Sequence, residues 1–104
     1  MSNYTKGRTF EYDRKAYFES QGNVVMRTAG SHGPFDLIAV STWSGTVKFI
    51  QCKCVQTAKH AERLVKEFKA NPPLPILHTV NRGSGYMQAI VVKVKGGTII
   101  EGWV

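Results

Sequence analysis

Three polar side chains within two short apolar segments have the types and spacing needed for chemistry. Asp36 lies in one β-branched-rich segment, and Gln51 and Lys53 lie two residues apart in the next. Side chains alternate between the faces of a strand, so Gln51 and Lys53 are expected on one face, with the neighbouring apolar residues and cysteines on the other. Antiparallel pairing would bring Asp36 beside them. Burying a carboxylate, an amide and an ammonium together is costly, and a divalent metal ion next to a phosphate would compensate that cost.

Eight elements are predicted to position these residues. Runs with helix or strand spacing alternate with segments rich in glycine, proline and small polar residues. The predicted helices are Thr5–Gln21 and Thr57–Ala70, and the predicted strands are Asn23–Thr28, Phe35–Val40, Phe49–Cys54, Ile76–Val80, Tyr86–Lys95 and Thr98–Val104. The order α-β-β-β-α-β-β-β predicts an α/β (α+β) fold with a mixed sheet flanked by helices. A length of 104 residues predicts a single domain over residues 1–104.

The second predicted helix has the clearest periodicity in the chain. Thr57 is its expected N-cap, and apolar residues follow at helical spacing from Ala61 to Phe68. Lys59 and Arg63 lie largely off that apolar stripe. A charged helix face of this kind is usually only solvated, and the same face is also suited to a duplex backbone.

The charge balance favours a polyanionic partner. The chain has 14 Lys and Arg against 7 Asp and Glu, a formal charge of +7. Nucleic acid fits better than an anionic membrane, because no predicted helix pairs a basic face with a strongly apolar one. Charge alone leaves open a basic protein that binds nothing specific. No apolar run has the length of a membrane span and no signal core is evident, so an intracellular protein is expected.

The two cysteines, Cys52 and Cys54, are separated by one residue. A disulfide at that spacing would be strained, so both are expected as reduced thiols packed as small hydrophobic side chains in a reducing compartment. A zinc site using both thiols and His60 is an alternative that lacks a fourth ligand at normal spacing.

Two further features have both an ordinary and a functional interpretation. Glu11 is expected in the first turns of its helix, where the helix dipole favours an acid, and it is also a candidate for the metal site. The segment Ala29–Pro34 follows Arg27 and contains two glycines, a serine and a histidine. It is either a turn between strands or a loop whose backbone amides bind a phosphate.

Several of these segments together resemble a known family. They occur in matching order over roughly the first half of the chain, as Lys6-Gly7-Arg8, Phe10-Glu11, Val25 to Ser31, Phe35 to Ala39 and Ile50 to Lys53. The chain resembles the archaeal-type Holliday junction resolvases of the PD-(D/E)xK nuclease superfamily, phage-encoded versions included. The resemblance implies a restriction-endonuclease-like fold. It also implies a homodimer that binds four-way DNA junctions and nicks two opposing strands with Mg²⁺, for which Mn²⁺ can substitute.

The resemblance and the chemistry of the side chains together assign roles by position. Catalytic roles fall to Glu11, Ser31, Asp36, Gln51 and Lys53. Metal ligation falls to Asp36, Gln51, Glu11 and the backbone carbonyl of Cys52. DNA contacts fall to Lys6, Arg8, Arg27, Ser31, Lys59 and Arg63.

Gln51 is the departure from the family pattern, which usually has glutamate there. Its amide oxygen can ligate a hard cation but adds no charge, so weaker magnesium binding is expected. A Gln-x-Lys version of the motif is familiar from Mrr-like restriction nucleases. Two alternatives therefore stay open: an Mrr- or restriction-type nuclease that cuts duplex DNA, and a non-catalytic junction-binding module.

Overall fold

The structure, a computed structural model, describes residues 3–28, 33–76 and 85–104, with backbone alone for residues 3–5. Its elements are α1 (Asn3–Ser20), β1 (Asn23–Arg27), β2 (Leu37–Ser41), β3 (Val47–Val55), α2 (Ala58–Ala70), β4 (Tyr86–Val94) and β5 (Ile99–Trp103). Seven predicted elements are thus confirmed, with ends shifted by one or two residues. The predicted strand Ile76–Val80 lies outside the described residues except for Ile76, which is in no strand. Neither described helix is long and apolar enough to cross a membrane.

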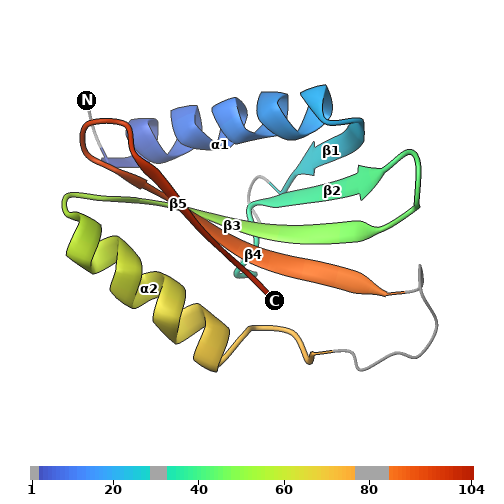
Figure 1. Ribbon diagram of the computed structural model, residues 1–104. Coiled ribbons are helices and arrows are strands. Elements are labelled where there is room, and N and C mark those ends of the chain that lie inside the picture. Colours follow the sequence, from blue (N-terminus) through green and yellow to red (C-terminus); the bar gives the residue numbers. More distant parts are fainter. Residues whose placement is uncertain (1–2, 29–32, 77–84) are drawn as a thin grey trace.

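The described strands form one mixed sheet in the order β1-β2-β3-β4-β5. Strands β1, β2 and β3 pair antiparallel, β3 and β4 pair parallel, and β5 returns antiparallel to β4. A parallel pair requires a long crossover connection, and α2 lies within the one between β3 and β4. Figure 1 shows α1 and α2 on opposite faces of the sheet. The α+β class predicted from the sequence is confirmed.

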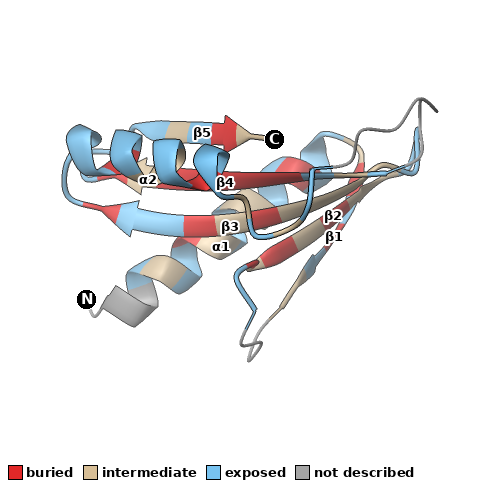
Figure 2. Cartoon of the chain, turned by 90° about the horizontal axis from the view of Figure 1, so that it is seen from below, coloured by how far each residue is buried: buried red, intermediate tan, exposed pale blue. Residues whose placement is uncertain are grey.

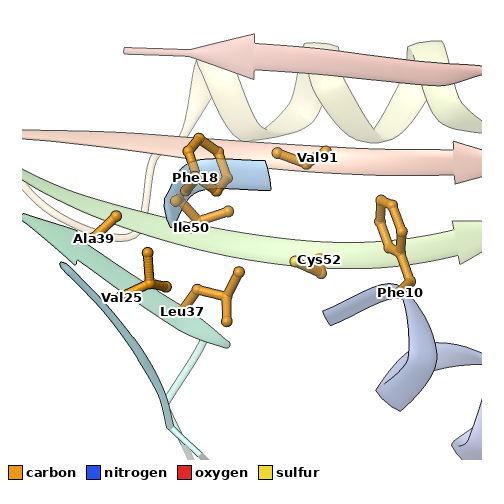
Figure 3. Packing of buried hydrophobic residues seen from close by; sticks show 8 residues of the cluster. All are labelled: Phe10, Phe18, Val25, Leu37, Ala39, Ile50, Cys52 and Val91. Atoms are coloured by element: carbon orange, nitrogen blue, oxygen red, sulfur yellow. The ribbon is translucent and has the colours of Figure 1, made fainter. Parts of the chain in front are cut away.

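Each helix covers its own hydrophobic cluster. The cluster under α1 comprises Phe10, Phe18, Val25, Leu37, Ala39, Ile50, Cys52 and Val91 (Figure 3). The cluster under α2 comprises Phe35, Val55, Ala61, Phe68, Ile90, Val92 and Val94. Strand β4 contributes to both clusters and is buried along most of its length (Figure 2), as expected of an internal strand.

Helix α2 begins and packs as its sequence predicts. The hydroxyl of Thr57 accepts a hydrogen bond from the backbone N–H of His60 at 3.1 Å, which caps the first turn. The buried face of α2 packs mainly against β4 and β5. There Gly102 of β5 lies so close to Val65 that an added Cβ would come within 2.6 Å of it.

The turn after α1 is joined to the β2–β3 turn. Gly22 has a positive φ of 85°, a conformation that glycine adopts without strain. Its carbonyl accepts hydrogen bonds from both the backbone N–H and the hydroxyl of Thr42, at 3.0 and 2.9 Å. Next to it, the Asn23 amide donates to the carbonyl of Phe18 at 2.9 Å. The C-terminal end of α1 is therefore attached to the hairpin of β2 and β3.

Candidate active site

Asp36 lies immediately before β2, where the pairing with β3 becomes irregular. Its backbone N–H donates to the carbonyl of Ile50 at 2.8 Å, while Leu37 is the register partner of Ile50. Two residues of one strand thus oppose one residue of the other, as in a β-bulge. The carbonyl of Asp36 points the other way and accepts from the Thr28 N–H of the segment after β1, at 2.9 Å. The bulge brings the Asp36 side chain into the space between β2 and β3.

The carboxylate of Asp36 occupies a hydrogen-bonding position in that space. Its Oδ2 accepts the backbone N–H of Cys52 at 2.8 Å. Burial raises the pKa of Asp36, and the nearby charge of Glu11 raises it further, whereas the Cys52 N–H and Lys53 lower it. The net effect is an increase, because desolvation disfavours the charged form most strongly. A half-buried carboxylate next to a second one is typical of functional sites.

Glu11 approaches Asp36 from α1, and it lies further along that helix than predicted. Helix α1 begins at Asn3, so Glu11 is in the helix interior and not in the first turn. The interpretation of Glu11 as an acid favoured by the helix dipole is therefore wrong, because that effect fades within one turn. Its Oε1 instead accepts a hydrogen bond from Nε of Arg27 at 3.0 Å, and both side chains are largely buried.

Tyr12 is a residue of this site that the sequence interpretation missed. The guanidinium of Arg27 lies 4.8 Å from the centre of its ring, and that of Arg8 lies 5.8 Å from it. A hydrogen bond from Arg8 and the positive charge of Arg27 lower the pKa of the Tyr12 phenol. The adjacency of Tyr12 to Glu11, between two arginine-containing segments, was the available signal. Arg8 and Arg27, both predicted to bind DNA, thus lie near the same aromatic ring.

Gln51 and Lys53 occupy one face of β3, as alternation predicts. Their register partners on β4 are Ile90 and Val92, which belong to the cluster under α2. Cys52 belongs to the cluster under α1. Lys53 is exposed, and its charge reaches Asp36 closely enough to lower the pKa of that carboxyl. The structure thus brings together Glu11, Arg27, Asp36 and Lys53.

Gln51 is linked to the group of Glu11, Arg27, Asp36 and Lys53 by its position in the β3 backbone, and not by a side-chain hydrogen bond. It is half-buried, and it directly precedes the Cys52 N–H that Asp36 accepts from. No hydrogen bond of the Gln51 side chain to another described residue is found.

The other predicted site residues are distributed over three regions. Ser31 lies outside the described residues. Lys6 and Arg8 are in the first turns of α1, on the exposed surface. Lys59 and Arg63 are exposed on α2, where Arg63 lies 3.9 Å from Glu67. The basic face of α2 is therefore confirmed as solvent-accessible, and its predicted DNA contact stays a prediction.

The cysteines differ from the sequence expectation in one respect. Both are free thiols, and Cys52 is buried as expected. Cys54 is exposed, and its thiol lies 3.9 Å from the backbone carbonyl of Lys6 in the first turns of α1. The expectation that both pack as buried hydrophobic side chains is wrong for Cys54. The alternative zinc site is not supported, because no three His, Cys, Asp or Glu side chains of the described segments cluster as a metal site.

The donor groups present are of the kind that magnesium uses. Asp36 and Glu11 supply two carboxylates close enough for the charge of one to raise the pKa of the other. Gln51 and Cys52 are adjacent on β3, where the Cys52 N–H donates to Asp36, and they carry neutral oxygens in an amide and a backbone carbonyl. Magnesium is usually held by one or two carboxylates and retains several waters, so a site with two acids and neutral oxygens fits it.

The fold of the described residues is an α+β arrangement of one mixed five-stranded sheet with a helix on each face. It is similar to the solved structure of Hjc, a Holliday junction resolvase from the archaeal hyperthermophile Archaeoglobus fulgidus. The TM-score is 0.55 at 20% identity, and the similarity covers 93% of this chain and 71% of the Hjc chain. At that identity the similarity establishes the fold. No protein-family model and no curated protein matches the sequence.

Proposed function

We propose that this protein is a structure-selective DNA endonuclease of the archaeal-type Holliday junction resolvases, which nicks paired strands of four-way junctions as a homodimer. The observation that carries the proposal is the Asp36 carboxylate, held between β2 and β3 by the Cys52 N–H within reach of Glu11 and Lys53. The resolvase-like fold and the charge of +7 support it. A substrate of this kind implies an intracellular site of action.

In this proposal, Asp36, Glu11, Gln51 and the Cys52 carbonyl hold Mg²⁺, with Mn²⁺ as a substitute. The bound ion would supply an activated water and neutralise charge on the phosphate. Asp36 is oriented for this role by the Cys52 N–H, which fixes one oxygen and leaves the other available. Burial raises the pKa of Asp36 most, and the charge of Glu11 raises it further; a cation held between the two carboxylates would oppose both effects.

The basic residues of the site contribute without reading bases. Lys53 donates to the scissile phosphate and stabilises the negative charge that develops during in-line attack. Arg27 and Arg8 lie beside Tyr12 and bind flanking phosphates, together with Ser31 from the preceding loop. Further contacts with the DNA backbone would come from Lys6, Lys59 and Arg63. Phosphate contacts of this kind position the protein on DNA. Selectivity for junctions would follow from the fixed separation of two active sites in a dimer.

A second candidate, a junction-binding module without cleavage activity, is favoured by one observation. Gln51 stands where a third acid would complete the site, and Arg27 neutralises one of the two acids that remain. A site with one unpaired carboxylate would bind magnesium weakly. Restoring the missing charge with Gln51→Glu separates the two candidates, because a nuclease should cut faster and a module should stay inactive.

The decisive experiment compares a four-way junction with linear duplex of the same sequence, in Mg²⁺ and in Ca²⁺. The expected result is symmetric paired nicks in the junction alone, lost in Asp36→Asn with junction binding retained. Asp13→Asn is the matched control, because Asp13 is an exposed acid of α1 outside the site, and it should cut normally. Equal cutting of duplex would favour a restriction-type nuclease. Normal cutting by Asp36→Asn would refute the site.

A further inference from the structure

A cavity of about 480 Å³ opens at the end of β3, which ends at Val55, two residues after Lys53. It is bounded by the first turns of α1, the end of β3 and the end of β4. Figure 1 shows these segments at one end of the molecule. Because Lys53 and Cys52 also line it, the cavity is continuous with the candidate active site.

The cavity is lined by four lysines and no acid. Lys6 comes from α1, Lys53 from β3, and Lys93 and Lys95 from β4 and its end. The ion pairs found in the described segments use none of these lysines. Like charges gathered in a concave surface raise the local concentration of anions. Lys93 and Lys95 have no role in the proposed reaction, and the ammonium of Lys93 lies 5.9 Å from the centre of the Phe10 ring.

The exposed thiol of Cys54 confirms that the lysines converge on the cavity. Cys54 lines the cavity between Lys53 and Val55. Cys54 is the register partner of Lys93 on β4, and its thiol lies 3.9 Å from the backbone carbonyl of Lys6 on α1. Two lysines from different elements are therefore close enough to act on one sulfur atom.

We infer that this lysine cavity binds backbone phosphates of the DNA strand next to the scissile phosphate, with Lys93 and Lys95 as phosphate ligands. The inference rests on the proposed function, since the strand would pass from Asp36 and Lys53 directly into the cavity. Lysine donors and the Thr9 hydroxyl suit phosphate oxygens. Phosphates held there would fix the direction in which the cut strand crosses the site.

Cys54 offers a direct readout of cavity occupancy. The chain has two cysteines, and the other, Cys52, is buried with a raised thiol pKa, so a neutral alkylating reagent should modify Cys54 alone. We expect saturating four-way junction in Ca²⁺ to slow alkylation of Cys54 by iodoacetamide about fivefold or more, because bound DNA limits access to the thiol. Mass spectrometry identifies the modified residue.

The double variant Lys93→Gln/Lys95→Gln tests the ligands themselves. Losing two phosphate contacts should weaken junction binding about tenfold or more at 0.1 M salt and reduce the slope of log affinity against log salt by roughly 1.8. Protection of Cys54 should be lost at DNA concentrations that saturate the natural protein. Lys15→Gln is the matched control, because Lys15 lies nine residues beyond Lys6 on α1 and pairs with Glu19. It should leave slope and protection unchanged.

The outcomes separate this inference from the proposed function. Junction binding without protection of Cys54, and with an unchanged salt slope in the double variant, would overturn the cavity assignment alone. Junction binding with protection but no cleavage in Mg²⁺ would support the cavity and refute the nuclease. Failure of the natural protein to bind junction or duplex at low salt would overturn both.

Discussion

The ion pair between Arg27 and Glu11 offers a quantitative test of the candidate site. Their closest atoms are 3.0 Å apart, and the two side chains are 16% and 20% exposed. Two unit charges at that distance attract by about 5 kcal/mol at an effective dielectric constant near 20. Desolvation offsets much of this, and a hydrogen bond between charged groups contributes a net of about 1.5–3 kcal/mol. We therefore expect a coupling free energy of about 2 kcal/mol between these residues.

A double-mutant cycle with Glu11→Gln and Arg27→Met, measured by urea unfolding at neutral pH, isolates this coupling. Arg27→Met should be the more destabilising single change, because it leaves the charge of Glu11 uncompensated beside Asp36. The double variant should recover part of that loss. Adding Mg²⁺ should reduce the cost of Arg27→Met, since a cation between the two acids would replace the guanidinium charge.

The pair Lys15–Glu19 is a matched control, with a nearly equal distance of 2.9 Å on the exposed side of the same helix. Exposed pairs at this spacing typically contribute about 0.3–0.5 kcal/mol. A coupling below about 0.5 kcal/mol for Arg27 and Glu11 would show that burial does not strengthen the pair, and would refute the reasoning.

Three further predictions concern stability. Because its folded pKa is raised, Asp36 contributes stability that is fully present below its unfolded pKa and is lost as pH rises through the folded value. Asp36→Asn should therefore raise the free energy of unfolding at pH 7 by about 0.5–2 kcal/mol, and it should flatten the pH dependence of that free energy in the acid range. Unfolding titrations in which the variant is less stable than the natural protein at pH 7 would contradict this. Gly102→Ala should lower the free energy of unfolding by about 1–3 kcal/mol, because the new Cβ would lie 2.6 Å from Val65. Gly7→Ala should instead stabilise α1 by about 0.5–1 kcal/mol, because no atom of the other described residues lies within 4 Å of the added Cβ. Thermal unfolding measures both, and a shift of the same sign would count against the packing argument. Mg²⁺ should raise the melting temperature of Gln51→Glu more than that of the natural protein, since an added carboxylate tightens binding. Equal shifts in a fluorescence melt would remove Gln51 from the metal site.

The parts of the fold that the sequence predicts correctly are those determined by residues close to one another in the chain. Thr57 and the apolar stripe from Ala61 to Phe68 specify α2 within one segment, and the structure confirms both the cap and the buried face. Alternation likewise predicted that Gln51 and Lys53 share a face of β3. These patterns need no knowledge of distant contacts.

The site itself depends on contacts between distant segments. Arg27 was expected to bind phosphate, and nothing local shows that it pairs with Glu11, 16 positions earlier. The bulge at Asp36 arises from a hydrogen bond to the carbonyl of Ile50. The regular alternation of side chains along a strand does not predict such an irregularity.

The hydrogen bonds between Thr42 and Gly22 have a consequence for the geometry of the site. They attach the C-terminal end of α1 to the β2–β3 hairpin, so a change in the tilt of α1 is a rotation about that end. Glu11 lies nine residues before Ser20, the last residue of α1, about 14 Å along the helix, so a tilt of about 5° would displace it by roughly 1.2 Å. The separation of Glu11 and Asp36 therefore depends on a turn remote from both, and substitutions at Thr42 are expected to change the geometry of the candidate site without touching any of its residues.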